Sequence, residues 1–148
     1  MSRVRTAALL LCMLATALTL PAGAAASKSR DMLNAVNWVR AQNGLPALRY
    51  SRTLAHSAHS YSRTMMHRGY FGHDSRIHAS RRFRSLGEIL EWRRGLRPRV
   101  GATLRDWMNS PPHRAVILNG AFKYAGAGFV RGRFHGHRAT IWTMHFGR

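Results

Sequence analysis

Cysteine, acidic residues and lysine are all scarce in this chain of 148 residues. It contains one cysteine, Cys12, and five acidic residues against 24 basic ones, which gives a formal net charge of +19. Only Lys28 and Lys123 are lysines, so the positive charge comes almost entirely from arginine. No long apolar run follows Leu20. These absences exclude a disulfide-rich scaffold and, beyond the first residues, a transmembrane segment.

The first residues have the pattern of a secretory signal peptide. Arg3 and Arg5 precede an apolar run over residues 6–20, and small residues follow Pro21. We expect a signal peptide over residues 1–26, with cleavage after Ala24 or Ala26, and one domain over residues 27–148. The predicted localisation is therefore secreted, in the extracellular space or the cell envelope. The mature chain then lacks cysteine, which excludes a thiol nucleophile.

The charge bears on possible partners. Loss of Arg3 and Arg5 lowers the formal net charge from +19 to +17. Such a charge attracts anionic envelope polymers, lipid headgroups or nucleic acid through the planar guanidinium groups. Phe83 and Trp92 lie among arginines, but no nucleic-acid stacking motif accompanies them, so we predict no specific nucleic-acid partner.

Apolar periodicity predicts four helices in the mature chain. The first covers residues 30–42, and the second begins after the N-cap Ser51 and ends near His67. A third runs from Val100 to Ser110, and a short fourth begins at Pro111. Between the second and third helices, residues 69–98 are arginine-rich and only weakly periodic, which predicts a long loop.

The C-terminal part changes to a strand pattern. We predict strands over residues 124–130 and 139–146, with a hairpin loop over 131–138. Alternation turns Trp142, Met144 and Phe146 toward the core and His145 toward the polar face, so His145 receives no functional role. Helices followed by antiparallel strands predict an α+β domain.

A set of short motifs recurs in a fixed order. It consists of Asn37-Trp38-Val39-Arg40, Asn43-Gly44-Leu45, Phe71-Gly72-His73, Gly87-Glu88, the segment Trp107 to Arg114, Ala125-Gly126-Ala127-Gly128, and the segment Trp142 to Gly147. With these motifs, residues 32–147 resemble a CAP-superfamily (SCP) domain. That superfamily groups cysteine-rich secretory, antigen 5 and pathogenesis-related type 1 proteins, and the chain is most similar to its cysteine-free bacterial branch.

The resemblance implies a fold and a site. The fold is an α-β-α sandwich with a central antiparallel sheet between helical layers, and the site is a cleft lined by histidines and acidic residues. His73 matches the first cleft histidine, Glu88 the cleft glutamate and His113 the second histidine. Ser110 stands where many eukaryotic members have a second glutamate, and Ile89 stands where asparagine usually follows Glu88.

The site residues suggest a ligand class. Two neutral imidazoles and one carboxylate suit Zn²⁺ or another divalent cation, with water completing the shell. The hypothesis is therefore a ligand cleft of His73, Glu88, Ser110 and His113, with the two histidines and Glu88 as metal ligands. Because a second carboxylate is absent, the site offers less negative charge to such a cation.

Several functions stay open on these residues. The favoured one is a secreted binding module for a divalent cation, a lipid or another small amphiphile. One alternative is a hydrolase in which Glu88 with His73 or His113 activates water on a peptide or cell-wall substrate. Another is a cationic adhesin for anionic envelope polymers. In a further alternative, Glu88 only orients the histidines through hydrogen bonds. No Gly-x-Ser-x-Gly nucleophile motif is present, and the balance is against an enzyme.

Overall fold

The computed structural model describes residues 22–74, 76–79 and 82–148. Its elements are α1 (Ala22–Gln42), β1 (Arg49–Tyr50), α2 (Arg52–Arg68), β2 (Leu86–Arg94), α3 (Val100–Asn109), α4 (Pro111–Ile117), β3 (Tyr124–Phe134) and β4 (His137–Gly147). The predicted α+β class is confirmed. Residues 1–21 of the predicted signal peptide lie outside the described residues, and residues 22–26 form the start of α1.

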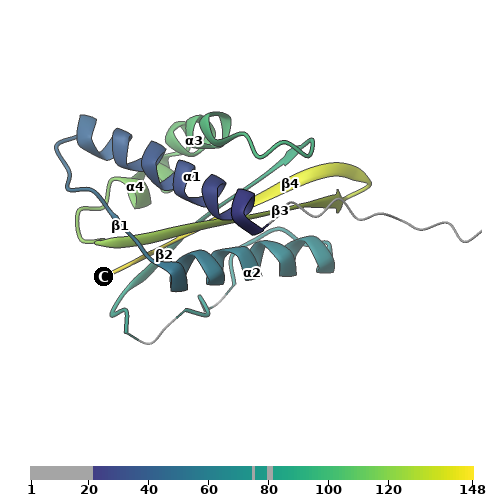
Figure 1. The fold of residues 1–148 in the computed structure, drawn as a ribbon, viewed down its shortest axis with the longest axis horizontal. Helices are drawn as coiled ribbons and strands as arrows, with labels where there is room; N and C mark the ends of the chain where they lie inside the picture. Colours follow the sequence, from purple (N-terminus) through teal and green to yellow (C-terminus); the bar gives the residue numbers. More distant parts are fainter. Residues whose placement is uncertain (1–21, 75, 80–81) are drawn as a thin grey trace, which may run out of the picture.

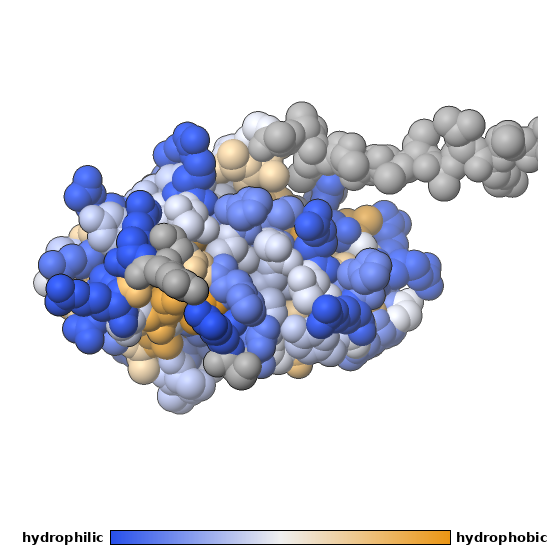
Figure 2. All heavy atoms as spheres, turned by 90° about the horizontal axis from the view of Figure 1, so that it is seen from below, coloured by the Kyte–Doolittle hydropathy of each residue, from blue (hydrophilic) through white to orange (hydrophobic). Residues whose placement is uncertain are grey.

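The sheet lies between two helical layers, as the α-β-α sandwich requires (Figure 1). Its strand order is β1-β3-β4-β2, with β3, β4 and β2 antiparallel. The short edge strand β1 is parallel to β3 and was not predicted. Helices α1, α3 and α4 cover one face and α2 covers the other, and this second face is mostly hydrophilic on the outside (Figure 2). No helix of the described residues is long and apolar enough to cross a membrane.

The four predicted helices are present, although α1 begins at Ala22 rather than at residue 30, and two of the loop predictions are wrong. Ser51 caps α2 by accepting a hydrogen bond from the backbone N–H of Leu54 at 3.3 Å. The predicted loop over residues 69–98 contains β2, and most of the predicted hairpin loop over 131–138 is strand, with the turn at His135 and Gly136. His135 and Gly136 both have positive φ, 47° and 78°, so the hairpin turns within these residues.

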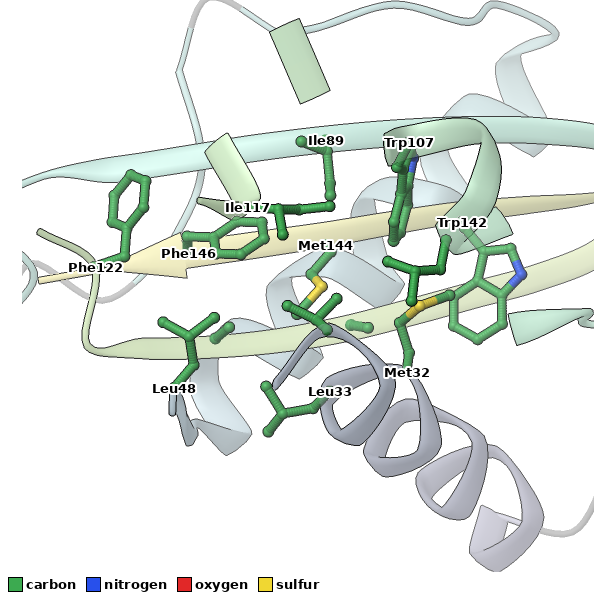
Figure 3. Close-up of a cluster of buried hydrophobic side chains, with 14 of the residues drawn as sticks. Met32, Leu33, Leu48, Ile89, Trp107, Ile117, Phe122, Trp142, Met144 and Phe146 are labelled. Atoms are coloured by element: carbon green, nitrogen blue, oxygen red, sulfur yellow. The ribbon is translucent and has the colours of Figure 1, made fainter. Parts of the chain in front are cut away.

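The larger core lies between the sheet and the layer of α1, α3 and α4. Figure 3 shows Met32 of α1, Trp107 of α3 and Ile117 of α4 directed toward Met144 and Phe146 of the sheet. The predicted inward face of β4 is thus confirmed, because its aromatic and methionine side chains are fully buried. A smaller cluster lies on the α2 side and contains Met65, Leu90, Phe134, Ala139 and Ile141.

A buried arginine joins α1 to the end of α4. The Arg40 guanidinium donates hydrogen bonds to the carbonyl oxygens of Pro46, Ile117 and Asn119 at 3.1, 2.7 and 3.0 Å. Burial lowers the pKa of this guanidinium. Because the side chain is fully buried and lies on three carbonyl dipoles, it fixes the helical layer that carries His113.

Candidate functional site

Glu88 is the centre of a hydrogen-bonded cluster on the α2 side of the sheet. It lies on β2, an edge strand, and its side chain is only 6% exposed. Its Oε1 is 2.8 Å from Nδ1 of His73, and its Oε2 is 2.7 Å from Nε2 of His145. Both carboxylate oxygens therefore have an imidazole partner, which stabilises the carboxylate away from water.

His145 is a site residue that the sequence analysis missed. The prediction that it faces a polar side is wrong, because α2 covers that face and leaves the side chain 1% exposed. Strand register sets Glu88 and His145 directly opposite each other on β2 and β4, so their side chains share one face. The available signal was the composition of β4: a strand apolar on both faces is covered on both sides, and a histidine within it needs a partner.

His73 approaches Glu88 from the segment after α2. Its side chain is 58% exposed, in contrast to the buried carboxylate. The preceding residue, Gly72, is held in place by Tyr61 of α2, whose hydroxyl donates to the Gly72 carbonyl oxygen at 2.6 Å. Burial raises the pKa of Tyr61 far above its ordinary value, so this hydroxyl stays a donor. The position of His73 is thus set by a half-buried side chain of a helix.

The carboxylate dictates where each imidazole carries its proton. An ionised carboxylate only accepts hydrogen bonds, so His73 carries a hydrogen on Nδ1 and His145 carries one on Nε2. In the neutral imidazoles, the lone pairs then lie on Nε2 of His73 and on Nδ1 of His145. The first belongs to an exposed side chain and the second to a buried one. Glu88 is arranged to orient two imidazoles.

His113 and Ser110, the other two predicted cleft residues, lie at the start of α4. His113 is in the first turn of α4 and is half-buried. Burial lowers the pKa of His113, and the positive charge of His73 lowers it further. Ser110 occupies the predicted N-cap position of α4, but its side chain makes no capping hydrogen bond.

The residues present fit a metal site only in part. Among the described residues, no group of three or more His, Cys, Asp or Glu side chains is arranged to hold a metal ion. Both carboxylate oxygens of Glu88 are hydrogen-bonded to imidazoles. Toward a cation, Glu88 would therefore act by orienting His73 through Nδ1 and not as a direct ligand. His73 and His113 remain as candidate first ligands, with water for the other positions.

Two hollows adjoin the α2 layer. A cavity of about 330 Å³ is bounded by Ser57, Tyr61, Glu88 and His145 on its inner side. A separate groove of about 390 Å³ lies between the start of α1 and α2, with Ala25, Ala26, Tyr50 and Phe129 among its lining. The groove is the more apolar of the two and is the place where an amphiphile would fit. Cleavage after Ala26 would remove part of its wall.

Basic side chains form a row at one end of the sheet. The backbone of Arg49 bonds to that of Lys123, Lys123 to Gly147, and Arg148 to both Arg84 and Ser85. Arg84, Lys123 and Arg148 line one surface hollow, and the Arg49 guanidinium lies over the Tyr124 ring at 5.7 Å. We call these four exposed residues, Arg49, Lys123, Arg148 and Arg84, the cationic row. It lies at the end of the molecule where the chain terminates in Figure 1.

Comparison with known proteins gives one family. The sequence model of CAP, the cysteine-rich secretory protein family, matches residues 33–146. The chain is 29% identical to the protein YkwD of Bacillus subtilis over 126 residues, which are 79% of this chain and 46% of that protein. It is 26% identical to the membrane protein YlbC of the same organism, over 71% of this chain and 32% of that one. The chain thus spans less than half the length of these relatives.

Solved structures show the same fold. An extracellular protein of Bacillus anthracis that contains an SCP domain superposes with a TM-score of 0.66 at 25% identity, over 82% of this chain and 40% of that one. An outer surface protein of Borrelia burgdorferi superposes with a TM-score of 0.67 at 18% identity, over 82% of this chain and 92% of that one. The second likeness shows the fold alone.

Proposed function

We propose that this chain, which belongs to the cysteine-rich secretory protein (CAP) family, is an exported binding module that holds a divalent cation between His73 and His113. Export is supported by the leader pattern of residues 1–26 and by similarity to a protein described as extracellular. The domain spans only part of its relatives, so the proposal concerns the domain and its cleft.

The observation that carries the proposal is the hydrogen bond between Glu88 and Nδ1 of His73. It fixes the proton on Nδ1 and leaves the Nε2 lone pair on a side chain that is 58% exposed. A carboxylate behind a histidine is the usual second partner of a metal-bound imidazole and raises its basicity. The lowered pKa of His113 keeps that imidazole neutral near neutral pH, as ligation requires. A bound cation would supply Lewis acidity or a fixed positive charge in the cleft.

The test is calorimetry of the mature chain with Zn²⁺, without a histidine tag. We expect binding heat that disappears in His73→Ala/His113→Ala, because both candidate ligands are removed. Glu88→Gln should weaken binding by about 10- to 100-fold, the range for loss of an orienting partner.

The matched control is His56→Ala/His67→Ala, which removes two exposed histidines of α2 and leaves the cleft intact. This variant should retain the heats of the parent chain. Equal heats for the parent and His73→Ala/His113→Ala would contradict the proposed cation site.

A second candidate function is adhesion to an anionic envelope polymer, and the cationic row favours it. Neighbouring strands lie about 4.8 Å apart, so side chains carried by successive strand ends form a regular line of charge. A polymer with repeated phosphates or carboxylates is the complementary ligand. This function does not involve Glu88 or the histidines, and the two candidates can be tested separately.

A further inference from the structure

Ser57 lies on the buried face of α2 and meets His145 of β4 in the interface between this helix and the sheet. Its Oγ is 2.9 Å from Nδ1 of His145, although 88 residues separate the two in sequence. Ser57 is 9% exposed and His145 is 1% exposed. A chain of hydrogen bonds therefore joins Ser57, His145 and Glu88, with lengths of 2.9 and 2.7 Å.

The direction of these bonds follows from the carboxylate. Glu88 requires the hydrogen of His145 on Nε2, which leaves the Nδ1 lone pair aimed at the Ser57 hydroxyl. A hydroxyl, an imidazole lone pair and a carboxylate in this order form the arrangement of a nucleophile, its base and the group that orients the base. The imidazole is reversed end for end relative to the usual serine protease arrangement, but the proton positions are equivalent.

The three residues share a cavity of about 330 Å³. Ser60 and Thr64 add hydroxyl groups to its lining, Arg68 and Arg76 add guanidinium groups, and Asp74 adds a carboxylate. Hydroxyls suit a hydroxyl-rich molecule, and the guanidinium groups are the donors available for an oxyanion. The volume lies within the range of small-molecule sites.

We propose that Ser57 is the nucleophile of an acyl-transfer site, with His145 as general base and Glu88 as the orienting carboxylate, acting on carboxylic esters of hydroxyl-rich molecules. Ser57 Oγ forms a bond to the acyl carbon while its proton passes to Nδ1 of His145. The ester C–O bond then breaks, and the alcohol leaves with that proton. Water attacks the acyl-serine and gives a proton to His145, which releases the carboxylic acid and restores Ser57.

The Ser57 hydroxyl has one other acceptor. The His78 carbonyl oxygen lies 2.8 Å from Oγ, so the hydroxyl hydrogen can be directed either to this oxygen or to His145. Rotation about the Cβ–Oγ bond exchanges the two without moving the heavy atoms. The hydrogen bond to His78 thus holds Oγ in place, and the bond to His145 activates it.

The acyl-transfer site shares Glu88 with the proposed cation site but uses different histidines. It uses Nδ1 of His145 and the inner side of Glu88, whereas the cation site uses the exposed nitrogen of His73 and His113. Reactions in the presence of EDTA therefore test Ser57 alone, and calorimetry with Zn²⁺ tests the cation alone.

The experiment is labelling of the mature chain with a fluorophosphonate probe in EDTA, followed by mass spectrometry of the peptides. The serine oxygen displaces fluoride from phosphorus, so a label reports an activated hydroxyl. We expect the label on Ser57 and hydrolysis of p-nitrophenyl acetate, both reduced at least tenfold in Ser57→Ala and in His145→Gln.

Ser62→Ala is the matched control. Ser62 is another buried serine of α2, but its hydroxyl bonds to Thr143 at 2.8 Å, and no imidazole of the described residues is its partner. This variant should be labelled as the parent is. Circular dichroism and thermal unfolding check that each variant folds. Mapping the label on the parent chain tests the proposal even if a variant does not fold. An unlabelled Ser57 in the folded parent, or equal labelling of the parent and folded His145→Gln, overturns it.

Discussion

At the scale of single residues, one carboxylate organises the candidate site. The chain has only five acidic residues, and Glu88 places one of these charges almost fully inside the protein. Its two oxygens are shared between an exposed imidazole, His73, and a buried one, His145. The same carboxylate therefore orients one lone pair toward solvent and another toward the cavity. Loss of Glu88 would disturb both proposed sites, whereas variants of the histidines separate them.

The pKa of His113 gives a prediction on the pH dependence of stability. Burial and then the charge of His73 hold this pKa below its ordinary value near 6.5. As the pH falls toward 6.5, the imidazole of the unfolded chain takes up a proton before that of the folded chain does. His113 therefore lowers the free energy of unfolding as the pH falls. We expect His113→Asn to gain stability relative to the parent chain between pH 7.5 and pH 5, measured by urea unfolding.

The control for this measurement is His137→Asn, which removes an exposed histidine at the start of β4. Its unfolding free energy should follow the parent curve across the same pH range. The prediction fails if the difference between His113→Asn and the parent is constant with pH.

At the scale of elements, the packing of α2 on β3 depends on glycine. A Cβ atom at Gly128 would lie 2.2 Å from the backbone nitrogen of His59, and one at Gly126 would lie 2.2 Å from that of Ala55. No rotamer change relieves a contact with helix backbone, so α2 would have to move away from the sheet. Because α2 carries Ser57 and Tyr61, the same movement would open the site.

We therefore expect Gly128→Ala to lower the free energy of unfolding by about 1–3 kcal/mol, the range for overpacked contacts. The measurement is chemical denaturation monitored by tryptophan fluorescence. Gly132→Ala on the same strand is the control, because its Cβ would meet only the flexible side chain of Met66, at 3.1 Å. An equal loss of unfolding free energy in the two variants would contradict a role for the close contact between Gly128 and the α2 backbone.

The elements that the sequence predicted correctly are those with a strong local signal. Helices α2, α3 and α4 have apolar periodicity and recognisable starts at Ser51, Val100 and Pro111. Local composition predicts a loop in place of strand β2, because arginines occupy the end of this edge strand. Its pairing with β4 depends on residues far away in the sequence, which local composition does not report.

The candidate site shows the same division. His73, Glu88 and His113 were found through the resemblance to CAP domains, and the structure brings His73 directly to Glu88. Ser57 and His145 were not found, because their contact is set by α2 covering β4 and by the register of β2 on β4. Alternation along β4 correctly separates its two faces, but it does not show that helices cover both.

At the scale of the whole molecule, the cationic row gathers four of the 24 basic residues at one end of the sheet. Arg84, Lys123 and Arg148 line one hollow. Their backbones are joined through the strand ends, so the spacing of the charges is fixed by the sheet rather than by flexible loops. A polyanion bound there would release counterions in proportion to the contacts formed.

This arrangement predicts a local contribution to polyanion binding. A labelled single-stranded oligonucleotide, used only as a probe with regular phosphates, should bind the mature chain with an affinity that falls steeply with salt. Each lost phosphate contact lowers the slope of log K against log salt by about 0.7. The variant Arg84→Gln/Lys123→Gln/Arg148→Gln should therefore have a slope smaller by about 2, measured by fluorescence anisotropy.

The variant Arg63→Gln/Arg105→Gln/Arg138→Gln removes the same charge from exposed positions outside the row. Its slope should fall clearly less if the row is a binding site, and equal slopes for the two variants would mean that net charge alone attracts the probe.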